Sequence, residues 1–137
     1  MKKGFGHFEN KGGKALGPDD PIVTGWFHRR DRSFTITREV AYIDRHGNRW
    51  EIFPGDTNNG ATIPRILHRI WTPYTERFRD AAAFHDPYCV NKVRGQKMTH
   101  EMYWGILRCT GVNPITAYMQ WLAISAWCWW TWPEWKQ

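Results

Sequence analysis

The sequence has few cysteines. Its 137 residues include only Cys89, Cys109 and Cys128, an odd number without paired spacing. This pattern argues against a disulfide framework and against a zinc knuckle. No apolar run follows the amino-terminal lysines, so that segment does not resemble a secretory signal, and we expect synthesis in a reducing cytoplasm.

A long hydrophobic run is also lacking. Residues 115–130 carry no charge, but as a helix they would span about 24 Å, short of the roughly 30 Å hydrocarbon core of a bilayer. We therefore expect no transmembrane span.

The chain is basic, with a net charge of +6 from 19 Lys+Arg and 13 Asp+Glu. Such a balance permits anionic partners. No recognition-helix pattern, zinc-finger spacing or aromatic RNA-binding signature accompanies the charge, so we do not expect nucleic acid as a partner.

The chain changes in character from strands to helices. Residues 1–21 are rich in Gly, Lys, Pro and Asp without a sustained period, and they predict a flexible basic arm. The stretch FTITREVAYI alternates apolar and polar residues, and the Gly47-Asn48 turn before Trp50 predicts a hairpin. This order predicts an α+β fold in residues 22–137, a single domain in which a small antiparallel N-terminal sheet precedes three to four packed helices.

Local signals predict where the helices begin and end. Pro87 is expected to end or kink the first long helix just after a His-Asp pair. The second helix is expected to begin at a Thr99 cap and to stop at Gly111. The third is expected to begin with Asn113 as its cap and Pro114 as its first residue. The predicted buried face of the second helix consists of Met102, Tyr103, Ile106 and Leu107.

The stretch RDAAAFHDPYCV places His85 and Asp86 side by side. Adjacent helical residues point about 100° apart, so the pair can share one site only at a helix end, which Pro87 would supply. The candidate catalytic residues are His85 and Asp86, with the acid orienting the imidazole as a general base. The candidate metal ligands are His85, Asp86, His100 and Asn59, with Asp56 of the same loop as an alternative source of an oxygen ligand. A structural interpretation stays open, in which His85 bonds within the core and Asp86 pairs with Arg65 or Arg79.

Four blocks follow one another along the chain: NNGATIPRI, YTERFRDAAAFHDPYC, THEMYWGILRCTGV and AYMQWLAISAW. Over about residues 34–130 they resemble a family of phage and prophage proteins known as domain of unknown function 1353. That family has a loop similar to Thr-Asp-Gly-Ala-Ser-Ile-Pro-Arg, a helix ending in His-Asp-x-x-Tyr, and a later helix with an Ala-Asp pair. The resemblance implies a bacteriophage-encoded protein without a settled activity.

The resemblance also implies which positions belong to a site. His85 and Asp86 correspond to the family's His-Asp pair, Asn59 stands where the family has Asp, and His100 falls close to the later Asp. The corresponding loop positions are Gly60, Thr62, Pro64 and Arg65. A site with fewer acids favours a softer ion, so zinc or another divalent metal is the candidate cofactor.

Tryptophan is concentrated near the carboxyl end. Six of the ten tryptophans are Trp121, Trp127, Trp129, Trp130, Trp132 and Trp135. One small core cannot cover them all, so we expect some at an interface with other phage proteins or with a second copy. Peripheral contact with a membrane and a carbohydrate-stacking surface stay open as alternatives.

Two functions of different classes are consistent with these features. The first is a small bacteriophage-encoded structural or accessory protein, made in the host cytoplasm and part of, or associated with, the virion. The second is a small metal-dependent hydrolase that acts on cell-envelope material or phosphoesters during entry or lysis. A host-directed binding protein is a third hypothesis, which only the small size and positive charge permit.

Overall fold

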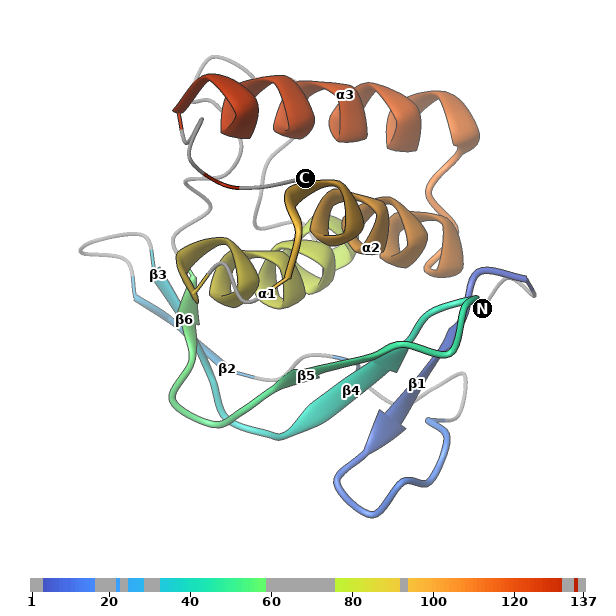
Figure 1. Cartoon of the computed structure of the whole chain (residues 1–137). Helices are drawn as coiled ribbons and strands as arrows, with labels where there is room; N and C mark the ends of the chain where they lie inside the picture. The colour runs from blue at the N-terminus through green and yellow to red at the C-terminus, as the bar shows by residue number, and fades with distance from the viewer. Residues whose placement is uncertain are drawn as a thin grey trace.

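A computed structural model of the chain describes residues 4–16, 22, 25–28, 33–58, 76–91, 94–131 and 135. Short antiparallel strands precede the three described helices, α1 (Glu76–Asn91), α2 (Gln96–Cys109) and α3 (Pro114–Thr131), so the α+β prediction is confirmed. Figure 1 shows the strands on one side, α1 and α2 in the middle, and α3 on the far side from the strands.

The strands form two three-stranded antiparallel sheets. The first has the order β1 (His7–Asn10), β4 (Val40–Ile43), β5 (Arg49–Ile52), and the second has the order β2 (Gly25–His28), β3 (Ser33–Ile36), β6 (Thr57–Asn58). The stretch FTITREVAYI is therefore divided between the sheets, because residues 37–39 interrupt its extended pairing.

The predicted hairpin is confirmed between β4 and β5. The carboxylate of Asp44 accepts hydrogen bonds from the backbone N–H groups of His46 and Asn48, at 2.8 and 2.9 Å. Gly47 has a φ of 85°, which favours glycine. The turn residues thus set the register that places Tyr42 opposite Trp50.

Part of the segment predicted as an arm forms a strand. Residues 7–10 are β1, which pairs with β4 and buries Phe8 against Tyr42, with ring centroids 5.1 Å apart. Four residues with one buried aromatic side chain carry too short an alternation to be recognised in the sequence. The strand forms because β4 supplies its hydrogen-bonding partners.

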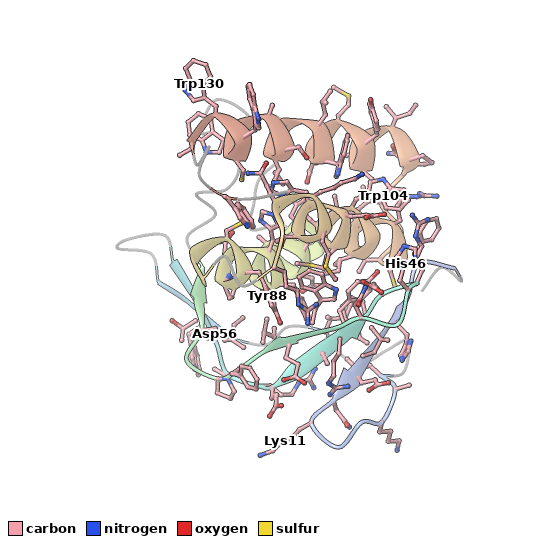
Figure 2. All side chains as sticks on the ribbon, in the orientation of Figure 1. Lys11, His46, Asp56, Tyr88, Trp104 and Trp130 are labelled. Atoms are coloured by element: carbon pink, nitrogen blue, oxygen red, sulfur yellow. The ribbon has the colours of Figure 1, made fainter. Side chains whose placement is uncertain are left out.

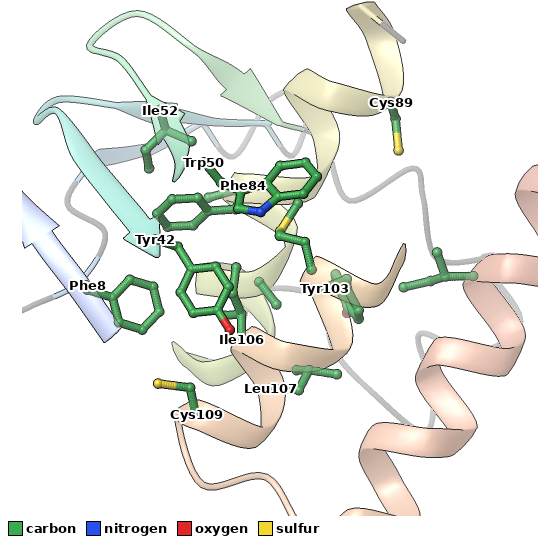
Figure 3. Packing of buried hydrophobic residues seen from close by; sticks show 14 of the residues in the cluster. Phe8, Tyr42, Trp50, Ile52, Phe84, Cys89, Tyr103, Ile106, Leu107 and Cys109 are labelled. Atoms are coloured by element: carbon green, nitrogen blue, oxygen red, sulfur yellow. The ribbon is translucent and has the colours of Figure 1, made fainter. Parts of the chain in front are cut away.

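The core lies between the first sheet and the two inner helices. Figure 3 shows Phe8, Tyr42 and Trp50 facing Phe84 of α1 and the side chains of α2. The predicted buried face of α2 is confirmed for Met102, Tyr103, Ile106 and Leu107.

Most predicted helix ends are confirmed. Gly111 follows α2 with a φ of 96°, and the Asn113 side chain accepts a hydrogen bond from the backbone of Thr116 at 2.8 Å, directly ahead of Pro114 as first residue of α3. The Thr99 cap is wrong. The N-cap of α2 is Gly95, and the Thr99 hydroxyl donates back to the Gly95 carbonyl at 2.9 Å from inside the first turn.

Of the two outcomes expected for Pro87, an end of the first helix is wrong, since α1 continues through it to Asn91, and a kink stays a prediction. A proline removes one helical hydrogen bond. The turn that follows is held by tertiary contacts instead. The Tyr88 hydroxyl accepts a hydrogen bond from the backbone N–H of Glu51 at 2.8 Å, and its ring packs edge-on against Trp50. Cys89 is buried.

Candidate functional site

His85 and Asp86 lie within α1, not at its end. Both side chains are buried, and that of His85 is 0% exposed. The two residues were expected to share one site at a helix end, and they do not lie at one. The His85 ring faces α2, where it meets the ring of Tyr103 edge-on with centroids 5.2 Å apart.

The structure brings His85 and His100 together. Nε2 of His85 lies 2.9 Å from Nδ1 of His100, which is itself buried on α2. A hydrogen bond at this distance requires one ring to donate its N–H and the other to accept. The two histidines are thus direct neighbours in the core, while their role in a shared metal site stays a prediction.

Two cysteines join the histidines. Sγ of Cys89, one turn after His85 on α1, lies 3.2 Å from Nδ1 of His85. Cys128 of α3 hydrogen-bonds with Cys89 and with the His100 imidazole. These four side chains, His85, Cys89, His100 and Cys128, are called the His/Cys cluster below. It connects the three helices, and all four residues are buried.

Sequence reasoning named the histidines of this cluster but gave its cysteines no role. Cys89 follows His85 by four residues, and this spacing places the two side chains next to each other on one helix. The spacing could therefore have predicted their contact. No local signal pointed to Cys128, because it belongs to another helix and reaches the cluster only through packing.

Burial governs the protonation of the cluster. It holds the pKa of His85 well below the usual 6.5, and repulsion by His100 acts in the same direction. The hydrogen bond with Cys89 lowers the pKa of Cys128 to about 6, against the opposing effect of burial and with further help from His100. At neutral pH the cluster therefore combines a neutral His85 with a Cys128 thiol that ionises readily.

Trp135 covers the cluster on one side. Its ring meets that of His100 edge-on at 5.4 Å, and its Nε1 donates to the carbonyl of Arg94 at 2.8 Å. Only 4% of Trp135 is exposed, so this tryptophan lies in the interior and not at the predicted interface. The polar indole nitrogen finds its partner inside the protein, which makes this burial favourable.

The predicted metal site is only partly described. Among the described residues, no group of three or more His, Cys, Asp or Glu side chains is arranged to hold a metal ion. Asn59, Gly60, Thr62, Pro64 and Arg65 lie outside the described residues. Their approach to His85 stays a prediction.

A separate hollow lies between α2 and α3. It has a volume of about 290 Å³ and is lined by Lys97, Glu101, Trp104, Tyr118 and Trp121. Aromatic faces with a polar rim suit a stacking ligand, so the hollow keeps the carbohydrate alternative open.

Residues 34–124 match the family described as Protein of unknown function (DUF1353). The chain belongs to this family. The matched range includes most of β3, β4 to β6, the inner helices and more than half of α3. It therefore holds His85, Cys89 and His100 but stops before Cys128.

Two relatives come from Sinorhizobium fredii (strain NBRC 101917 / NGR234). Uncharacterized protein y4iH is 28% identical over 92 residues, and Uncharacterized protein y4jT is 26% identical over 125 residues. The alignments cover 66% and 89% of this chain but only 38% and 37% of the relatives, which are therefore much longer. No solved structure matches the chain significantly.

Proposed function

We propose that this chain is a bacteriophage-encoded structural or accessory protein that works as part of the virion by burying one face of α3 against other protein. The phage origin rests on the resemblance of the sequence blocks in residues 34–130, while the matching family is itself described only as a protein of unknown function. The observation that carries the proposal is the exposed, uncharged surface of α3.

That surface, called the outer face of α3 below, is formed by Ile115, Tyr118, Met119, Leu122, Ala126, Trp129 and Trp130. These positions recur every three to four residues and form one stripe along the helix. The opposite stripe is buried and contains Ala117, Gln120, Ile124 and Cys128. Figure 2 shows Trp130 on the side of α3 that points away from the strands.

The exposure of the outer face is large for such apolar side chains. Trp129 is 64% exposed, Trp130 78% and Ile115 74%. Residues 114–131 contain no Asp, Glu, Lys or Arg. Contiguous apolar surfaces of this kind mark interaction sites on soluble proteins, because leaving them in water is unfavourable.

Of the other predicted interface residues, Trp127 is 38% exposed and flanks the outer face, whereas Trp121 is partly buried and lines the hollow beside Tyr118. Trp132 lies outside the described residues. Among the helices that the structure describes, none is long and apolar enough to cross a membrane.

The hydrolase alternative receives less support from the geometry. A general base must reach its substrate or an activated water, yet His85 is fully buried and Asp86 nearly so. Interior packing of this pair favours a structural role for it.

Mass spectrometry of particles purified from a host strain that encodes the chain tests the proposal. We expect its peptides to co-purify with the particles, and expect Leu122→Glu on the outer face to reduce its incorporation. Phe53→Glu is the matched control, because Phe53 is similarly exposed but lies beside the strands. Particles that lack the chain would refute the virion role.

A further inference from the structure

Two pairs of side chains on the outer face of α3 complement each other in size along the helix. Its two ends are Ile115 and Trp130, and its middle falls at Leu122 and Ala123. A two-fold axis through that middle would place Ile115 opposite Trp130 and Met119 opposite Ala126. In both pairs a large side chain meets a smaller one.

We propose that the outer face of α3 binds a second copy of this chain, with the two α3 helices antiparallel about a two-fold axis near Leu122. The proposal rests on the role assigned to this face above and names its partner. A two-fold contact uses the same patch on both copies, so the patch must complement itself, and large-against-small pairing along an antiparallel axis meets that requirement.

The size of the face fits such a contact. Eighteen helical residues extend about 27 Å. With aromatic side chains of about 150–250 Å² each, the exposed fractions leave roughly 700 Å² of mainly apolar surface on the outer face. Standard interfaces bury about 800 Å² per partner, whereas the largest patch of a monomer is about 300–600 Å².

Charge favours a second copy over a membrane. Helices that bind membrane surfaces carry Lys and Arg on the face next to their apolar stripe, where these residues meet anionic headgroups. The net charge of +6 is positive, but none of it comes from residues 114–131. An uncharged stripe does not repel its own copy, and it offers anionic lipid no complementary charge.

Sedimentation of the full chain over a range of micromolar concentrations tests the dimer. We expect the parent to sediment as a dimer and Leu122→Glu to sediment as a monomer, because two carboxylates would then meet at the axis. Phe53→Glu is the control and should remain dimeric. Far-ultraviolet circular dichroism and the melting temperature show whether each variant is folded.

Cross-linking tests the direction of the helices without a disruptive substitution. Under a mild oxidant, the double variant Met119→Cys/Ala126→Cys should form disulfide-linked dimers, because the two positions face each other across the axis. Met119→Cys alone should not, because antiparallel pairing keeps the two copies of this position apart. The native cysteines are buried and should not contribute.

Several results would overturn the inference: a parent that stays monomeric, a Leu122→Glu variant that stays dimeric, or efficient cross-linking of Met119→Cys alone. Binding of a monomeric parent to anionic phosphatidylglycerol vesicles would assign the face to a membrane instead. A monomer that is nevertheless incorporated into particles would refute the dimer and leave the virion role intact. A dimer that is absent from particles would refute the virion role and leave the dimer intact.

Discussion

Nε2 of His85 and Nδ1 of His100 lie 2.9 Å apart in the interior, where α1 packs against α2. The contact is a hydrogen bond only while at least one facing nitrogen lacks a proton. A neutral pair meets this condition, while protonation of both rings would place two like charges in contact without water. The stability of the helix pair should therefore depend on pH.

The first prediction is a loss of stability in mild acid. The pKa of His85 is lower in the folded state than in the unfolded state, where it is about 6.5, so below that pH unfolding takes up a proton. The contribution of His85 to stability is fully present above about pH 6.5 and falls as pH decreases toward its folded pKa, by up to about 1.4 kcal/mol per pH unit. Urea unfolding at several pH values measures this slope.

His85→Gln should reduce that slope, because it removes the group that takes up the proton. His46→Gln is the control, since His46 is exposed in the β4–β5 turn and should leave the slope unchanged. An identical slope in the parent and in His85→Gln would contradict the assignment.

The second prediction concerns the thiols. All three cysteines are buried, so none should react quickly with an aromatic disulfide reagent in the folded protein, although the pKa of Cys128 is lowered to about 6. All three should react after denaturation. Rapid modification of Cys128 in the native protein, located by peptide mass spectrometry, would show that the His/Cys cluster opens to solvent.

The third prediction concerns the hydroxyl of Tyr103, which donates to Oε1 of Gln120 at 2.7 Å and so connects α2 with α3. Tyr103→Phe should lower the free energy of unfolding by about 1–3 kcal/mol, because it leaves a buried acceptor without its donor. Adding Gln120→Leu should restore part of the loss. Tyr118→Phe is the control, because Tyr118 is exposed. Equal effects of the two Tyr→Phe changes in urea unfolding would argue against the contact.

The fourth prediction concerns metal. His85 already bonds with His100 and Cys89, so zinc would have to displace contacts within the His/Cys cluster. We expect no stoichiometric zinc in the purified protein and no change in melting temperature with EDTA. Elemental analysis that finds one zinc per chain, lost in His100→Ala, would instead establish the metal hypothesis.

Features set by neighbouring residues were predictable from the sequence. The Gly47 turn, the Gly111 stop and the Asn113 cap each depend on a backbone angle or a hydrogen bond within a few residues. The strand-then-helix order follows from the same local patterns. The continuation of α1 beyond Pro87 could not be predicted from neighbouring residues, because contacts of Tyr88 with the first sheet stabilise the turn that follows the proline.

The sequence by itself determined the order of the elements and identified His85 and His100 as candidates for one site. Only the tertiary structure decided that Cys128 completes their cluster and that Trp135 is buried while Trp130 is exposed. The reason is that a cap or a turn depends on residues close together in the sequence. These environments form only when α1, α2, α3 and Trp135 pack together. Two tryptophans only a few residues apart, Trp130 and Trp135, are therefore exposed and buried respectively.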